Sequence, residues 1–184
     1  MQKLNMTYTA ASIAGAYVGL GFFTLFNLSA ILVFLISIIA SGIIGIIVYI
    51  FCFRFINVDN HLAALMASVG ALFFIDEIII HATNASPLTF PSLFSDVMFE
   101  IGLIGFRGDL LFVFFTSIIS MILLWLLLYR SSLGLATRAV SQQATAAQLC
   151  GIDIHQTNAI LFFVAGMLGG IAGVMIGAAV GILS

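Results

Sequence analysis

The sequence predicts an all-α, polytopic membrane protein with about five transmembrane helices and one further helix on the cytoplasmic side. Of the 184 residues, 63% are hydrophobic and only 7% are charged, whereas an average soluble domain has roughly 25% charged residues. The apolar stretches are also long and continuous, without the residue-by-residue alternation of strands in a membrane β-barrel. We therefore expect a single transmembrane domain over residues 1–184.

The predicted spans follow from length. A spanning helix needs roughly 20 mostly apolar residues, because each residue adds about 1.5 Å against a hydrocarbon layer about 30 Å thick. The stretches that meet or approach this length are residues 10–26, 29–53, 61–81, 110–129 and 157–183. Only Asn27 and Leu28 separate the first two stretches, so we expect them to form a tight helical hairpin.

The basic residues predict the orientation of the chain, because they stay preferentially on the cytoplasmic side of a membrane. With Lys3 inside, alternating spans place the remaining arginines as follows: Arg54, Arg130 and Arg138 inside, and Arg107 outside. Residues of about 82–109 then form an external loop, and residues of about 130–156 form a cytoplasmic one.

The hydrophilic stretch between the last two spans, residues 131–151, predicts one amphipathic helix of about four turns. Its polar residues recur at three- and four-residue spacing and share one face: Arg138, Ser141, Gln142, Thr145 and Gln148. The opposite face carries small apolar residues: Ala136, Val140, Ala144 and Ala147. Ser131 or Ser132 can cap the start of this helix, and Gly151 can supply the left-handed residue that ends it.

The apolar face of this helix also indicates what it binds. Because that face is mostly alanine, it offers lipid less surface than the Trp, Phe and Leu faces of interfacial anchors. We therefore expect a groove on another protein as its partner. A surface helix without a partner remains the alternative reading.

Glycines mark the last span and the first. They repeat every four residues along one stripe of the last span, with a second stripe beside it: Gly169, Gly173, Gly177 and Gly181, then Gly166 and Gly170. Gly15 and Gly19 form a shorter version in the first span. Stripes of small residues allow helices to approach closely, so we expect helix packing. The alternative is that they line a path for a substrate.

Several kinds of chemistry are not expected. Lys3 is the only lysine, which excludes a P-loop, so any ATP must be bound by another chain. A net charge of -2 provides no basic field for nucleic acid. Cys52 and Cys150 lack the spacing of a metal or redox site.

The acidic and histidine residues do not form a convincing catalytic or metal site either. His61 and His81 lie about 30 Å apart along one predicted helix and cannot share a metal ion. Glu77 can contact His81 at four-residue spacing. Serine- and zinc-protease motifs are absent, and the one conceivable aspartate pair, Asp76 and Asp109, is expected at solvated outer ends of spans. We therefore predict no catalytic residues, no metal, no cofactor and no enzyme.

The hydrophilic loop resembles that of a known family. Gly134, Arg138-Ala139, Ala147 and Gly151-Ile152-Asp153, followed by a glycine- and alanine-rich span, resemble the cytoplasmic loop of permease subunits of branched-chain amino-acid ABC importers. Further similarities extend over nearly the whole chain: Leu4-Asn5 with Gly15-Ala16-Tyr17, residues 61–70, and Pro91-Ser92-Leu93-Phe94. The chain departs from the family pattern at two places: Gln142 and Gln143, and Tyr8, Thr9 and Ala10.

The resemblance implies a multi-pass protein of the cell inner membrane that works in an ABC importer. Two permease subunits, identical or different, would surround a path, and an external binding protein would deliver the substrate. The cytoplasmic helix of each would serve as a coupling helix to an ATPase subunit, which binds the ATP and drives alternating access. The residues assigned to this coupling are Gly134, Arg138, Ala139, Gln142, Ala147, Gly151 and Ile152.

For the path itself we assign Gly15, Tyr17 and Gly19, as small residues and a polar handle. The expected cargo is a branched-chain or other hydrophobic amino acid. Alternatives are the same architecture importing urea or a short amide, and a non-transporting fragment of a permease. The last follows from the expectation that relatives have a helix before this chain's start and further helices after Ser184.

Overall fold

Apolar helices dominate the computed structural model, which describes residues 7–26, 30–54, 56, 61–83, 88–89, 98–101, 104–180 and 182–183. Side chains are described for residues 12–21, 31–54, 56, 62–83 and 108–180. The long helices are α1 (Thr7–Phe26), α2 (Ala30–Val48), α3 (His61–Thr83), α4 (Gly108–Arg130) and α7 (Ile154–Val180), and α2 continues as a π-helical turn, η1 (Tyr49–Phe53).

These helices confirm the predicted all-α membrane architecture. Within the described residues, four are long and apolar enough to cross a membrane: Ile31–Phe53, Leu62–Thr83, Gly108–Arg130 and Ile154–Val180. The fifth expected span corresponds to α1, of which the shorter apolar helix Ser12–Gly21 has described side chains. When η1 is counted as the end of α2, each long helix begins and ends within three residues of the predicted stretch.

Short strands were not expected. Strand β1 (Leu88–Thr89) pairs antiparallel with β4 (Ile182–Leu183), and β2 (Met98–Ile101) pairs with β3 (Ile104–Arg107). The last span was predicted to reach residue 183, but α7 ends at Val180 because the chain then enters β4. Pairs of two to four residues carry too weak a sequence pattern to be recognised.

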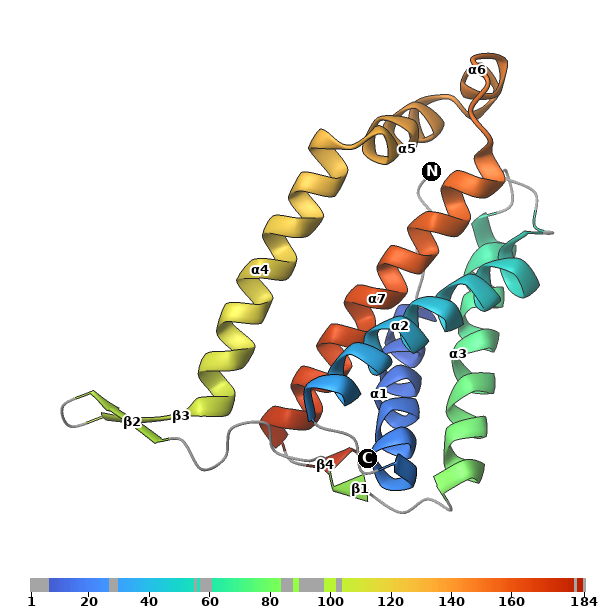
Figure 1. Ribbon diagram of the computed structural model, residues 1–184. Helices are drawn as coiled ribbons and strands as arrows, with labels where there is room; N and C mark the ends of the chain where they lie inside the picture. The colour runs from blue at the N-terminus through green and yellow to red at the C-terminus, as the bar shows by residue number, and fades with distance from the viewer. Residues whose placement is uncertain are drawn as a thin grey trace.

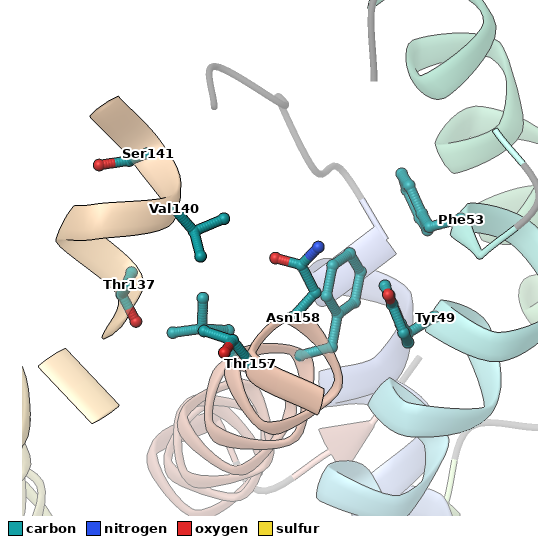
Figure 2. A pocket seen from close by; sticks show the side chains of 9 residues that line it. Tyr49, Phe53, Thr137, Val140, Ser141, Thr157 and Asn158 are labelled. Carbon is teal, nitrogen blue, oxygen red and sulfur yellow. The ribbon is translucent and has the colours of Figure 1, made fainter. Parts of the chain in front are cut away.

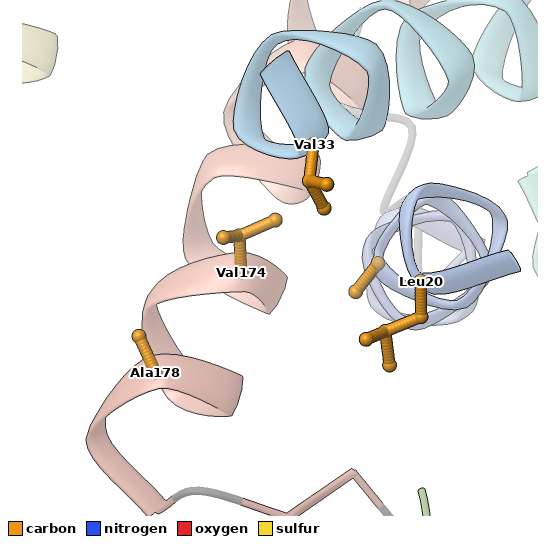
Figure 3. Close-up of a cluster of buried hydrophobic side chains, with 5 residues drawn as sticks. Leu20, Val33, Val174 and Ala178 are labelled. Atoms are coloured by element: carbon orange, nitrogen blue, oxygen red, sulfur yellow. The ribbon is translucent and has the colours of Figure 1, made fainter. Parts of the chain in front are cut away.

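The tightest packing joins α1, α2 and α7. Their buried apolar side chains form one cluster at one end of this group: Ala16, Leu20, Val33, Val174 and Ala178 (Figure 3). Farther along the contact between α2 and α7 the facing residues are serine and glycine. There the Ser41 hydroxyl donates a hydrogen bond of 2.6 Å to the carbonyl of Gly166. Small residues let the helix backbones approach closely, which increases dispersion contacts where lipid provides no hydrophobic driving force.

A second buried cluster joins η1 to α3 and consists of Val48, Tyr49, Phe53, Ala64 and Ala71. The Phe162 ring of α7 packs against it, with its centroid 5.1 Å from that of Tyr49 and 4.9 Å from that of Phe53. The π-helical turn, which inserts an extra residue per turn, thus lies where α2, α3 and α7 meet.

Helix α4 stands apart from this group and crosses the view alone in Figure 1. None of the residues in its most apolar stretch is buried. One described link to the other spans is an edge-to-face contact, with 5.8 Å between the ring centroids of Phe34 and Phe112. Two short helices, α5 (Ser132–Gln142) and α6 (Ala144–Leu149), join the end of α4 to the start of α7.

Candidate functional site

The candidate site begins where α5 leaves α4. Ser131 caps α5, as expected, because its hydroxyl accepts a hydrogen bond of 3.2 Å from the Gly134 N–H. The same hydroxyl donates to the Leu127 carbonyl at the end of α4. A β-carbon on Gly134 would overlap the Leu128 carbonyl oxygen, so only glycine allows this close turn. Gly134 therefore shapes the elbow between α4 and α5.

The connecting segment is not the single helix that the sequence predicted. Gln143 adopts an extended conformation (φ -152°, ψ 101°) and separates α5 from α6. Its N–H still bonds the Ala139 carbonyl at 3.1 Å, and its carbonyl accepts from the Ala147 N–H at 3.0 Å. One residue thus closes α5 and opens α6, because extended geometry interrupts the helical hydrogen-bond series. We refer to α5, Gln143 and α6 together as the arm.

The end of the arm agrees with the prediction. Gly151 has a φ of +84°, the left-handed conformation that glycine adopts without strain. The Ile152 N–H donates to the Ala147 carbonyl at 3.0 Å, and the Gly151 N–H donates to the Gln148 carbonyl at 2.9 Å. Asp153 then caps α7, since its Oδ1 accepts from the backbone of His155 at 2.8 Å and Gln156 at 3.2 Å.

The two faces of the arm are as predicted. On the apolar face Val140 and Ala147 are buried, and Ala136 and Ala144 are half-buried. The polar residues are exposed: Arg138, Ser141, Gln142, Thr145 and Gln148. The arm also exposes Leu135 at 64% and Leu149 at 86%, which the sequence reading missed. An apolar residue directly before Cys150 and the terminating Gly151 was the available signal for Leu149.

The residues assigned to coupling divide by exposure. Arg138, Gln142 and Gly151 are exposed and can reach a partner. Ala139 and Ile152 are half-buried. Gly134 and Ala147 are buried within the chain, so they can only support the shape of the arm. Whether these residues couple to a partner stays a prediction.

Arg138 also has a partner inside the chain. Its guanidinium carbon lies 5.5 Å from the centre of the Tyr129 ring, and that ring stacks on Trp125 with 5.8 Å between centroids. A cation over an aromatic face contributes about 0.5–1 kcal/mol at an exposed site. This contact holds α5 against the end of α4.

A cavity of about 170 Å³ lies between the arm, η1 and the start of α7 (Figure 2). Its lining combines hydroxyl, amide and apolar side chains: Tyr49, Phe53, Thr137, Val140, Ser141, Thr157, Asn158, Leu161 and Phe162. The Tyr49 hydroxyl is 3.2 Å from His155 Nδ1 and is hydrogen-bonded to the Asn158 side chain. We refer to this space as the arm cavity.

A larger, mostly apolar groove of about 480 Å³ lies between α1 and α3. Tyr17, one of the residues assigned to the substrate path, lines it. Gly15 and Gly19 instead face α2: a β-carbon on Gly15 would lie 2.5 Å from that of Ser41, and one on Gly19 would overlap the Ser37 hydroxyl. The structure therefore separates Tyr17 from the two glycines, and their assignment to a path stays a prediction.

The glycines of α7 lie in its contacts with α1 and α2. A β-carbon on Gly166 would be 2.5 Å from the Ser41 carbonyl oxygen, and one on Gly170 would be 2.7 Å from the Ser41 β-carbon. One on Gly173 would overlap the Ser12 carbonyl oxygen. Gly169 and Gly177 are buried as well, whereas Gly181 lies outside the described residues. These positions leave no room for any side chain at Gly166, Gly170 or Gly173 without movement.

The remaining ionisable residues form no larger constellation. Glu77 and His81 make the expected contact at 3.7 Å, but both are exposed, at 69% and 85%. Asp109 was expected to be solvated, but it is 1% exposed. It lies in the first turn of α4, where the N–H groups at the helix start stabilise a carboxylate. No group of three or more His, Cys, Asp or Glu among the described residues could hold a metal ion.

Residues 1–184 match the protein-family model described as branched-chain amino acid transport system, permease component. The match covers the whole chain, including the arm and every long helix. No solved structure matches the chain.

Similar proteins include the probable branched-chain amino acid transport permease protein LivH of Methanocaldococcus jannaschii, 29% identical over 92% of this chain and 55% of that protein. The guanosine ABC transporter permease protein NupQ of Bacillus subtilis is 27% identical over 66% of this chain and 39% of NupQ. The probable ABC transporter permease protein YphD of Escherichia coli is 29% identical over 54% of this chain and 29% of YphD. The chain thus spans about half the length of the first relative and less of the others.

Proposed function

This chain belongs to the family of permease components of branched-chain amino acid transport systems, and we propose that it is the transmembrane subunit of an ABC importer for hydrophobic amino acids. It is a multi-pass protein of the cell membrane, and its family is one of transport permeases rather than enzymes. In this proposal ATP binds to a separate subunit, residues 1–184 act as one permease domain, and an external binding protein supplies the cargo.

The observation that supports this proposal most strongly is the arm. It leaves the membrane helices between α4 and α7, turns its small apolar residues inward and exposes Arg138 and Gln142. At its far end Leu149 is 86% exposed and is available for contact with a partner. A polar face beside two exposed leucines, Leu135 and Leu149, fits a protein groove better than water.

The proposal requires sidedness and partners. Residues of about 130–156 face the cytoplasm, and residues of about 82–109 form the external loop. The ATPase receives the arm, and a second permease subunit, identical or different, completes the path. Binding and hydrolysis of ATP then displace the arm and shift the helices between outward- and inward-open arrangements.

Reversal of the Arg138 charge tests the coupling. We expect Arg138→Glu to lower ATP-driven leucine uptake at least tenfold in proteoliposomes while the protein still purifies with its ATPase. Arg130→Glu is the matched control, because it makes the same charge change at the end of α4, outside the arm. Leucine uptake that Arg138→Glu leaves unchanged would count against the proposal.

A nucleoside is the second candidate cargo, because the similar protein of Bacillus subtilis is described as a guanosine permease. Urea and short amides remain the third. Uptake of labelled leucine, guanosine and urea, each measured with the other compounds as unlabelled competitors, separates the three. If a complex with ATPase and binding protein hydrolyses ATP independently of every cargo, the chain is a non-transporting fragment.

A further inference from the structure

The arm cavity lies between the arm, η1 and α7. Thr137 and Val140 line it from the arm, Tyr49 and Phe53 from η1, and Asn158 from α7. Figure 2 shows the Asn158 amide in the middle of the space, between Val140 on one side and Tyr49 with Phe53 on the other. A molecule in this cavity would contact the arm and the membrane helices at the same time.

The polar groups of the cavity favour a ligand that donates hydrogen bonds. The Thr137 hydroxyl donates to the Leu133 carbonyl at 2.7 Å, and the Thr157 hydroxyl donates to the Asp153 carbonyl at 2.8 Å. Each hydroxyl has a single proton and has used it within its own helix, so its lone pairs can only accept. An ammonium group, which has three donors and no acceptor, fits such an environment.

Charges of both signs lie near the same space. The Tyr49 hydroxyl is within electrostatic reach of Arg54, the residue that follows η1, and of Asp153, which caps α7. Arg54 is exposed and can turn toward a carboxylate at the cavity mouth. Arg54 and Asp153 do not line the cavity, but Phe53 and Thr157, their neighbours in sequence or by hydrogen bond, do. One positive and one negative side chain near a small cavity match a zwitterion better than a singly charged ligand.

The remaining walls are apolar, and the size limits the ligand. Phe53, Leu161 and Phe162 present aromatic and aliphatic surface. A volume of about 170 Å³ holds roughly a dozen water-sized positions at about 10–15 Å³ each. That is enough for a molecule of about ten non-hydrogen atoms and too little for a nucleoside or a peptide.

We propose that the arm cavity binds a free α-amino acid with an apolar side chain, and that its occupancy restrains the arm. The ammonium group binds near Thr137, Thr157 and Asp153, the carboxylate near Arg54 and the Asn158 amide, and the side chain against Phe53 and Phe162. Such a ligand ties α5 to η1 and α7 and opposes movement of the arm. The inference rests on the proposed function, in which this amino acid is the imported cargo and slows further import as it accumulates inside.

Direct binding tests the chemistry of the cavity. We expect the purified 184-residue chain in detergent to bind L-leucine in a calorimetric titration. Isoamylamine, which lacks the carboxylate, and 4-methylpentanoate, which lacks the ammonium group, should each bind at least tenfold more weakly. Glycine should also bind more weakly, because it leaves the apolar walls unfilled. Equal binding of isoamylamine and leucine would overturn the proposal of a zwitterion site.

Variants locate the binding. Asn158→Leu removes the amide at nearly constant volume, and Arg54→Gln removes the positive charge; each should weaken leucine binding at least tenfold. Thr83→Val is the matched control, since it removes one hydroxyl from the groove between α1 and α3. Circular dichroism and gel filtration check that each variant is folded. Leucine binding that Asn158→Leu and Arg54→Gln both leave intact would place the ligand elsewhere and refute the site.

Transport separates this inference from the proposed function. In proteoliposomes that contain the ATPase, leucine added on the arm side should inhibit initial leucine uptake, and Asn158→Leu should relieve the inhibition at least fivefold. If uptake occurs but internal leucine does not inhibit it, the inference fails and the proposed function stands. If the complex takes up no amino acid while the purified chain still binds leucine in the cavity, the proposed function fails instead.

Discussion

Ser37 is a buried residue whose hydroxyl has no hydrogen-bond partner among the described residues, and it is fully shielded at 0% exposed. The hydroxyl occupies the notch that the missing side chain of Gly19 leaves on α1. An unsatisfied buried hydroxyl costs about 1–3 kcal/mol. Close packing against Gly19, and not a hydrogen bond, is therefore what Ser37 contributes to the contact between α1 and α2.

This arrangement predicts a rescue between two substitutions. Gly19→Ala should destabilise the protein by about 1–3 kcal/mol, because its methyl group overlaps the Ser37 hydroxyl. Ser37→Ala should be neutral or stabilising, since it removes an unsatisfied group. The double variant should recover most of the loss, because the second substitution vacates the space that the first one needs. Thermal unfolding in detergent measures all three.

Gly21→Ala is the control for Gly19→Ala. A β-carbon at Gly21 would meet no atom within 4 Å, so the same substitution two residues along α1 should cost nothing. It should even favour the helix by up to about 1 kcal/mol. Equal stability of Gly19→Ala and Gly21→Ala would contradict the packing described for α1 and α2.

The structural role of a residue was predictable from the sequence where the group that it contacts is close in sequence. The cap at Ser131 and the left-handed Gly151 each depend on residues no more than five positions away. The roles of Ser37 and Ser41 were not predictable, because they depend on Gly19 and on Gly166, which is 125 residues from Ser41. Nothing in one sequence indicates which of its serines faces which glycine.

Among the elements, α5 is held to α4 by the contact between Arg138 and Tyr129. Tyr129→Leu removes the aromatic face and should make the amides of α5 exchange about 2–5-fold faster, which corresponds to about 0.5–1 kcal/mol. Hydrogen–deuterium exchange with mass spectrometry measures this rate. Tyr129→Phe keeps the face and should exchange like the parent protein; equal acceleration in both variants would mean that the ring acts through packing alone.

The side of the membrane on which the arm lies can be tested through its cysteine. Cys150 is exposed directly after α6, whereas Cys52 is half-buried in η1 and can be replaced in a Cys52→Ala background. A thiol reagent that cannot cross the bilayer should label Cys150 in inside-out vesicles and not in intact cells. Labelling of intact cells would place the arm outside and exclude contact with a cytoplasmic ATPase.

Helix faces were predictable from periodicity, and breaks within a helix were not. The polar residues from Arg138 to Gln148 share the exposed side of the arm as the spacing indicated. No glycine or proline marks the interruption at Gln143 in the sequence. Glutamine has no strong preference for an extended conformation within a helical stretch, so tertiary structure determines the break and local preference does not reveal it.

At the scale of the whole molecule, α1, α2 and α7 form a closely packed group, while α4 stands beside it with no buried residue in its apolar stretch. Hydrophobic length predicted each span because the membrane imposes it. The arrangement of the spans was not predictable, since a stripe of small residues indicates that a helix packs closely but not which helix packs against it.

A cross-link between α2 and α4 tests whether the two parts move relative to one another. Phe34 and Phe112 are in ring contact and can be changed to cysteine in a background with Cys52→Ala and Cys150→Ala. A short bifunctional thiol reagent should then lower ATP-driven uptake at least tenfold in the reconstituted transporter. Each single cysteine variant treated alike is the control. Full uptake after complete cross-linking would show that α2 and α4 move as one body.

The extended residue Gln143 divides the arm into two short helices, α5 and α6, which can change their relative angle, whereas one continuous helix could not. Helix α6 continues into α7 through a short segment closed by hydrogen bonds at Ile152 and Asp153. Helix α5 is anchored to α4 at Gly134 and Tyr129. A displacement of α6 is therefore transmitted directly to α7. It reaches α4 only to the extent that the backbone at Gln143 resists bending.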